Sequence, residues 1–210
     1  AVYHSTGRRR AFRMTSTVQI RDGATEIVRR PRASAVNGEM TLVASTEPVV
    51  EGVDFLDWAA AADDELLGTA LRAWVRMVRE REEQDGRVSP DLVPHNLMVT
   101  PSTELVVVDQ EWAASVDGDR AVQRGLFWLA ARLSQRVPPT RWSVATVGEL
   151  AAHLAALAEV AVAPDWLTAL VHEEARIQAA VQLPSSAGTT DEFIAACERD
   201  LAEVLGTTLE

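Results

Sequence analysis

The feature that most constrains the fold of this 210-residue chain is the run 91–112, in which two short apolar segments lie between polar turns. The apolar segments are 97–99 and 105–108, and a Pro-Ser-Thr turn separates them, which is a pattern typical of a hairpin. Because hairpin strands are antiparallel, the start of the first strand and the end of the second lie at the same end of the sheet. The sequence therefore predicts that three polar residues meet at that end: Asp91, Asn96 and Asp109.

These three residue types suit phosphoryl transfer. That reaction uses one carboxylate to orient the attacking hydroxyl group, and oxygen ligands to hold Mg²⁺ against the nucleotide phosphates. An Asp and an Asn on one short loop, with a second Asp at a strand end, supply these groups. The same residues can also have purely structural roles: Asp91 can cap a turn, and Asn96 can hydrogen-bond the local backbone.

The two motifs together resemble those of the protein-kinase and aminoglycoside-phosphotransferase superfamily. Residues 91–97 (DLVPHNL) are similar to its catalytic loop, and residues 108–111 (VDQE) are similar to its metal-binding loop. The resemblance implies a catalytic base at Asp91 and Mg²⁺ ligands at Asn96 and Asp109, with Glu111 as a further member of the metal site. It also implies Mg-ATP as the phosphoryl donor and a small-molecule or glycan hydroxyl group as the acceptor.

The remainder of the chain fits the α+β, protein-kinase-like fold that this resemblance implies, with a reduced antiparallel β N-lobe and a mainly helical C-lobe. Apolar alternation and turn residues predict strands over 12–20, 26–30 and 40–44, the first two joined by a turn at Asp22-Gly23. Helices are expected over 54–62, 63–85, 121–136, 146–162, 164–181 and 191–205. We place the N-lobe and hinge at 1–52 and the C-lobe at 53–210.

Four residues are candidates for nucleotide binding. Arg29 and Arg30 lie on the strand that carries the phosphate-pairing Lys in the superfamily, and this chain contains no Lys. Arg can meet a phosphate through two hydrogen bonds, although Arg and Lys are not interchangeable. Glu51 and Gly52 resemble the hinge segment whose backbone bonds adenine, and a plain interdomain turn explains the same pattern equally well.

Three features depart from the superfamily pattern. Ser89 stands where the catalytic loop has His or Tyr, no Gly-rich loop accompanies the first strands, and no helix with a pairing Glu is evident before the third strand. These departures leave open a pseudokinase-like interaction or regulatory module that performs no chemistry. A metal-dependent hydrolase is a third hypothesis, and the scattered positions of the four His residues disfavour it. We expect His95 to point to solvent and Trp74 to pack in the core beneath the catalytic loop.

A further resemblance concerns a larger protein. Residues 8–17 (RRRAFRMTST), the run 91–112 and residues 123–126 (QRGL) are similar to a segment found downstream of SAM-dependent methyltransferase domains in actinobacterial proteins. The resemblance implies that this chain is a C-terminal domain, with an N-terminal methyltransferase domain of the same protein as its partner.

Composition narrows the cellular setting. The net charge of −11 disfavours binding to nucleic acid or to an anionic membrane, and no apolar run approaches the roughly 18 residues of a membrane span. The first residues lack the apolar core of a signal peptide. A single cysteine, Cys197, excludes an intramolecular disulfide and fits a reducing compartment. We therefore predict a cytoplasmic protein.

Overall fold

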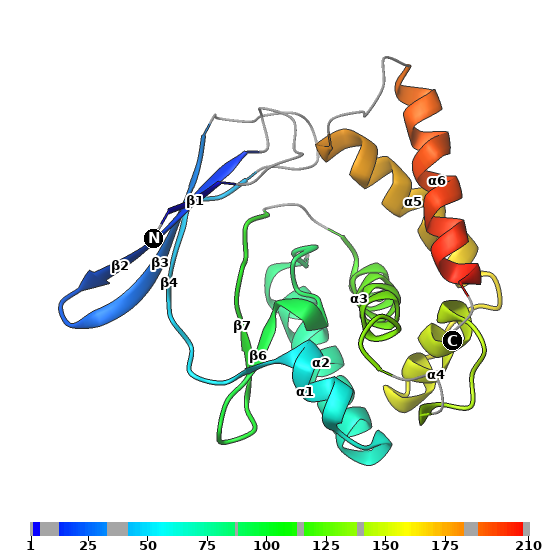
Figure 1. Cartoon of the computed structure of the whole chain (residues 1–210), viewed down its shortest axis with the longest axis horizontal. Coiled ribbons are helices and arrows are strands. Elements are labelled where there is room, and N and C mark those ends of the chain that lie inside the picture. The colour runs from blue at the N-terminus through cyan, green and yellow to red at the C-terminus, as the bar shows by residue number, and fades with distance from the viewer. Residues whose placement is uncertain are drawn as a thin grey trace.

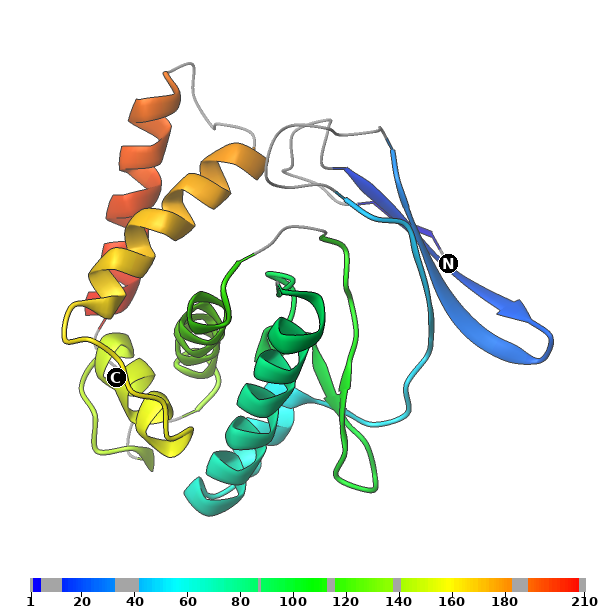
Figure 2. The ribbon, with the colours of Figure 1, turned by 180° about the vertical axis from the view of Figure 1, so that it is seen from behind.

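The computed structural model describes residues 2–4, 13–32, 42–86, 88–112, 116–137, 141–182 and 189–207, and it has a mixed α+β architecture. A four-stranded antiparallel sheet, in the order β1-β2-β3-β4, lies at one side of the molecule (Figure 1). The C-terminal helices lie at the opposite side, as the view from behind also shows (Figure 2). The strands of this first sheet are β1 Val2–His4, β2 Met14–Arg21, β3 Ala24–Pro31 and β4 Ser45–Pro48.

The β2–β3 hairpin confirms the predicted turn at Asp22-Gly23. Both turn residues have positive φ, 52° and 83°, which suits the tight turns that join twisted strands. The ladder pairs Ser16 with Arg29 and Thr15 with Arg30. Because successive side chains of a strand point to opposite faces, Arg29 and Arg30 lie on opposite faces of the sheet.

The predicted strand over 40–44 is wrong in its described part. Leu42 forms an isolated bridge with Trp112, and Val43 donates its N–H to the Glu111 carbonyl oxygen at 2.9 Å. Pairing with β3 begins only at Ser45, so β4 starts just after the predicted strand ends. The predicted Asn37-Gly38 turn lies outside the described residues.

A second sheet contains the predicted central hairpin. Its three strands are β5 Val53–Asp54, β6 Leu97–Val99 and β7 Leu105–Val107, in that order. A single 3-10 turn, η2 Pro94–Asn96, leads directly into β6. The proposed division after residue 52 falls in the connector between β4 and β5, and the separation into two domains stays a prediction.

Six α-helices complete the described chain, and most of their caps follow the sequence. They are α1 Phe55–Ala61, α2 Asp64–Asp85, α3 Gly118–Leu133, α4 Val147–Leu157, α5 Trp166–Val181 and α6 Thr190–Gly206. Asp54, Asp63 and Thr146 cap α1, α2 and α4 through their side-chain oxygens. Helix α4 ends earlier than expected, and Glu159 just beyond it has φ 57°. Among the helices described, none combines the length and apolar character that a membrane crossing requires.

The buried core lies where α2 and α3 meet the loop before β6. Trp74 of α2 is 0% exposed, which confirms its predicted place in the core. Its Nε1 donates to the Leu92 carbonyl oxygen at 3.1 Å, and its ring lies against the backbone of α3 at Gly125. This contact fixes the loop that carries Asp91 and Asn96 on a rigid helical base.

Candidate active site

The loop from Asp91 to Asn96 is tied to the segment that follows β7. Oδ2 of Asp91 accepts the backbone N–H of Glu111 at 2.6 Å and that of Trp112 at 3.0 Å. Nδ2 of Asn96 donates to the Asp91 carbonyl oxygen at 3.1 Å, and the Asn96 carbonyl oxygen accepts the N–H of Val108 at 2.8 Å. The hairpin therefore brings Asp91 and Asn96 to the residues around Asp109, as the sequence predicts.

Ser89 gives this loop a second connection. Its hydroxyl group donates to the Trp112 carbonyl oxygen at 2.9 Å and accepts the N–H of Asp91 at 3.2 Å. A Ser at this position therefore supports the geometry of the loop, although the resemblance calls for His or Tyr there.

Arg29 links the first sheet to the acidic segment after β7. Its side chain is 8% exposed, and its Nη1 lies 2.7 Å from Oε2 of Glu47 while its Nη2 lies 2.9 Å from Oδ1 of Asp109. The Nε atom lies 4.0 Å from Oε1 of Glu111, which is too far for a hydrogen bond. Oε2 of Glu47 also accepts the N–H of Asp109 at 3.1 Å. One buried guanidinium group thus contacts two carboxylates and lies near a third, and we call these four residues the Arg29 cluster.

Asp109 has an unusual backbone conformation within this cluster. Its φ of 60° lies in the left-handed region, where a non-glycine residue costs on the order of 1 to 3 kcal/mol. The bonds from Asp109 to Glu47 and Arg29 hold that conformation. Strain of this kind concentrates at functional sites, because the surrounding structure must be built to maintain it.

The electrostatics of the site act on Asp91. The pKa of Asp91 is raised to about 6, chiefly by burial; the negative charges of Glu111 and Asp109 also act to raise it, while the two backbone hydrogen bonds from Glu111 and Trp112 act to lower it. The three carboxyl groups are therefore close enough to interact. Asp91 changes its protonation state within reach of neutral pH, as a general base must.

The other predicted nucleotide-binding residues lie apart from this group. Arg30 points away from the Arg29 cluster, on the opposite face of the first sheet. Glu51 is exposed in the connector before β5. Gly52 lies against the turn end of the β6–β7 hairpin, where an added Cβ would sit 2.4 Å from the Val99 carbonyl oxygen. Gly52 thus has a packing reason to be glycine, and its role with a nucleotide stays a prediction.

Replacing Gly52 should therefore destabilise the protein. We expect Gly52→Ala to lower the free energy of unfolding by about 1 to 3 kcal/mol, because the new methyl group meets backbone atoms that cannot rotate away. Urea unfolding measures the change. Gly206→Ala is the matched control, since a Cβ there meets no atom within 4 Å. Equal effects of the two substitutions would contradict a tight contact between Gly52 and the hairpin.

Sequence reasoning missed three residues that build the site. Glu47 lies beyond the predicted strand over 40–44, and no local pattern shows that it faces Arg29 from the neighbouring strand. Arg124 of α3 donates to the Pro90 carbonyl oxygen at 2.5 Å and makes two hydrogen bonds to Glu174 of α5, at 2.7 and 3.3 Å. Glu174 is only 2% exposed, so this pair anchors the Asp91 loop to the C-terminal helices.

The expectation that His95 points to solvent is wrong. Its Nδ1 atom is enclosed and has no hydrogen-bond partner within the described structure. Burial, with the positive charges of Arg132 and Arg124, lowers the pKa of His95 to about 3. His95 is therefore neutral at physiological pH.

The residues at the site fit Mg²⁺ only in company with phosphate oxygens. Within the described ranges, no group of three or more His, Cys, Asp or Glu side chains is arranged to hold a metal ion. Mg²⁺ in phosphoryl-transfer sites takes one or two protein ligands and completes its shell with phosphates and water. Oδ1 of Asn96 is not used by the bond to Asp91, and the side chain of Asp109 is 50% exposed. Asn96 and Asp109 therefore fit as ligands, whereas the buried Glu111 faces Arg29.

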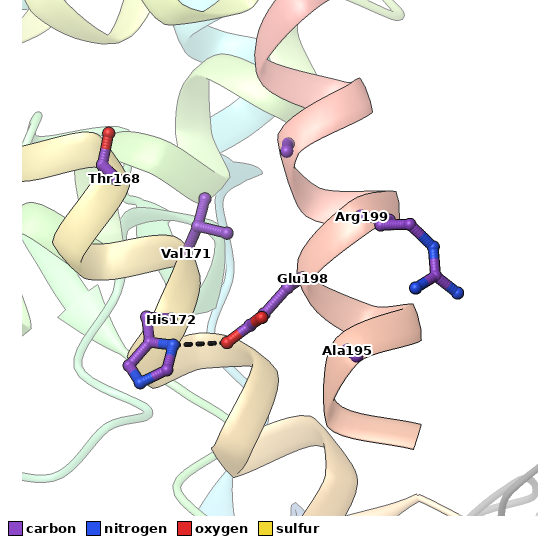
Figure 3. Close-up of a pocket in the computed structure, with 7 residues that line it drawn as sticks. Thr168, Val171, His172, Ala195, Glu198 and Arg199 are labelled. Atoms are coloured by element: carbon purple, nitrogen blue, oxygen red, sulfur yellow. Dashed lines mark hydrogen bonds and ion pairs between the residues drawn. The ribbon is translucent and has the colours of Figure 1, made fainter. Parts of the chain in front are cut away.

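A separate hollow of about 480 Å³ lies between α5 and α6 (Figure 3). A hydrogen bond between His172 of α5 and Glu198 of α6 connects the two helices there. None of the predicted site residues lines this hollow.

Comparison with known proteins adds no assignment: no protein-family model matches this sequence, and no curated protein matches it. The case for a function therefore depends on the chemistry of the residues themselves.

Proposed function

We propose that this chain has a kinase-like fold and acts as a phosphotransferase domain, which moves the γ-phosphoryl group of Mg-ATP to a hydroxyl group of a small molecule or glycan. The observation that carries the proposal is the Arg29–Asp109 contact, which joins the first sheet to an acidic segment beside Asp91 and Asn96. A cation from one sheet and oxygen donors from the other are the groups that phosphoryl transfer requires.

Asp91 would orient the acceptor hydroxyl group and take its proton. Its Oδ2 is held by the two backbone amides, which leaves Oδ1 to face the acceptor. The pKa of about 6 places the ionised form at neutral pH with useful basicity.

Asn96 and Asp109 would hold Mg²⁺, which neutralises charge on the transferred phosphoryl group when it is bound. Arg29 would then exchange its contact with Asp109 for a phosphate oxygen. Glu47, which bonds Nη1 of Arg29, keeps the guanidinium group in place during that exchange.

The pairing of Arg29 with carboxylates favours a second candidate function. Arg29 faces three carboxylates, and Arg rather than Lys occupies this place. A pseudokinase-like module that binds an attached methyltransferase domain would retain such a cluster for stability alone. The two candidates differ in whether ATP is consumed.

The reaction should depend on the ionised form of Asp91. We expect kcat/KM for Mg-ATP to fall about tenfold per pH unit below pH 6 and to level off above it, because only the carboxylate accepts a proton. Release of ADP in the presence of a panel of hydroxyl acceptors measures the rate. Asp91→Asn should reduce it about 100-fold or more, whereas Asp22→Asn, in the exposed β2–β3 turn, should not. A variant without Asp91 that keeps full activity would refute the proposal.

The same residue should limit stability. The pKa of Asp91 is higher in the folded protein than in the unfolded chain, so protonation of Asp91 favours the folded state. This stabilisation is complete below the pKa of the unfolded chain and is lost as the pH rises through about 6. Asp91→Asn removes that loss, and Asn can still accept the two amide hydrogen bonds. We expect it to raise the free energy of unfolding by about 3 kcal/mol at pH 8, since the pKa rises from 3.8 to about 6 and one pKa unit is about 1.4 kcal/mol, and by little at pH 4. Urea titrations at both pH values provide the measurement, and the same gain at both would show that ionisation of Asp91 is not its cause.

A further inference from the structure

The face of the first sheet opposite Arg29 contains a hollow of about 390 Å³, which we call the β2–β3 hollow. Its lining includes Thr15, Thr17, Gln19, Val28, Arg30 and Arg32. Thr15 lies directly opposite Arg30 in the ladder, and Thr17 lies opposite Val28. Residues opposite one another in a ladder share a face, so these side chains form one continuous surface. The backbone N–H of Arg32 extends the pairing by donating to the Arg13 carbonyl oxygen at 2.9 Å.

The chemistry of this hollow is that of an anion receptor. Two guanidinium groups, two hydroxyl groups and one amide group surround it, with Val28 nearly buried beneath them, and no carboxylate belongs to the described lining. Neither Arg30 nor Arg32 forms an ion pair with any other residue that the structure describes. Glu26 lies on the same face beside Gln19 and remains outside the lining. Within the described ranges, these two positive charges therefore lack an acidic partner, although the chain has a net charge of −11.

The hollow is distinct from the candidate active site. Arg29 and Arg30 are neighbours on β3, yet Arg29 faces Glu47 and Asp109 whereas Arg30 faces the hollow. The sheet itself separates the two groups, and a ligand in the hollow would not touch the Arg29 cluster.

From these observations we infer that the β2–β3 hollow binds a small molecule that bears a phosphate or pyrophosphate group. Guanidinium groups bond phosphate oxygens in pairs, and the Thr17 hydroxyl group can donate to a remaining oxygen. The hollow is larger than one phosphate, so it has room for the body of the molecule as well. This inference is independent of the phosphotransferase activity proposed above.

Titration calorimetry of the whole chain with pyrophosphate tests the inference. We expect saturable binding of one pyrophosphate at physiological salt, weakened roughly tenfold or more by Arg30→Gln and by Arg32→Gln, since each removes a charged hydrogen-bond donor. Arg21→Gln is the matched control, because Arg21 is exposed on the same hairpin and does not line the hollow. Unfolding midpoints establish that each variant is folded.

Four results would overturn the inference. Absence of binding by the wild type would do so, and so would binding that Arg30→Gln and Arg32→Gln leave unchanged, which would place pyrophosphate elsewhere. An equal loss in Arg21→Gln would indicate general attraction to positive charge. A parallel titration with citrate tests the ligand class, and citrate binding as tight as that of pyrophosphate would overturn the phosphate assignment.

Discussion

Gly125→Ala should destabilise this protein by about 3 kcal/mol or more, although Gly to Ala in a helix interior usually stabilises by up to about 1 kcal/mol. A Cβ on Gly125 would lie 2.4 Å from Cζ2 and 2.5 Å from Cη2 of Trp74, and 2.9 Å from Cδ of Pro94. Trp74 is fully buried and its Nε1 bonds the Leu92 carbonyl oxygen, so the ring cannot move without losing that bond. The added methyl group on α3 would therefore displace Trp74 of α2 and Pro94 of the Asp91 loop.

The matched control for this substitution is Gly148→Ala. Gly148 lies in the first turn of α4, and a Cβ there makes ordinary contact at 3.4 Å with the Leu205 carbonyl oxygen. We expect this variant to be neutral or more stable by up to about 1 kcal/mol, as helix propensity predicts. Urea unfolding of both variants measures the difference. If Gly125→Ala were as stable as Gly148→Ala, the tight packing of Trp74 against α3 would be disproved.

Arg29→Met should cost about 3 to 5 kcal/mol of unfolding free energy. The substitution keeps the apolar volume of the side chain and removes the charge that Glu47, Asp109 and Glu111 share. Glu47 and Glu111 are largely buried, so their carboxylates would lose this cation in a medium of low polarity. Asp109 is half exposed and contributes less, because water replaces its lost partner.

Arg30→Met is the control variant: it distinguishes the effect of losing the Arg29 cluster from the effect of losing an arginine elsewhere on the same strand. Arg30 is the next residue of β3, is exposed and faces away from the cluster, so we expect a change below about 0.5 kcal/mol. Urea unfolding of the two variants measures the difference. A loss of similar size in both variants would show that the Arg29 cluster does not hold the two sheets together.

The parts of the fold that depend on local sequence could be predicted. Two apolar segments and a Pro-Ser-Thr turn define the β6–β7 hairpin, and Asp or Thr at helix starts defines most of the caps. The expected strand over 40–44 failed because its backbone partners are Glu111 and Trp112, which lie far away in the sequence. Apolar character indicates that a segment pairs with something, but it does not identify the partner.

The candidate site was likewise predictable where it depends on local sequence and not where it depends on distant partners. Asp91, Asn96 and Asp109 come together because one short hairpin carries them all. The choice between Arg29 and Arg30 required the register of β2 and β3, since a shift of one residue exchanges the two faces of a strand. Glu47 and Glu174 were missed because their partners lie on separate elements.

The most direct test of the proposed nucleotide site is titration calorimetry of ATP, with and without Mg²⁺, on the wild type and on Asp109→Ala. We predict saturable binding that requires Mg²⁺ and that Asp109→Ala abolishes, because Asp109 is the exposed carboxylate of the cluster and the proposed metal ligand. Asp22→Asn, in the exposed turn of β2 and β3, should bind as the wild type does. An absence of heat at millimolar ATP under every condition, or binding that Asp109→Ala leaves unchanged, would contradict a nucleotide site built on Arg29 and Asp109.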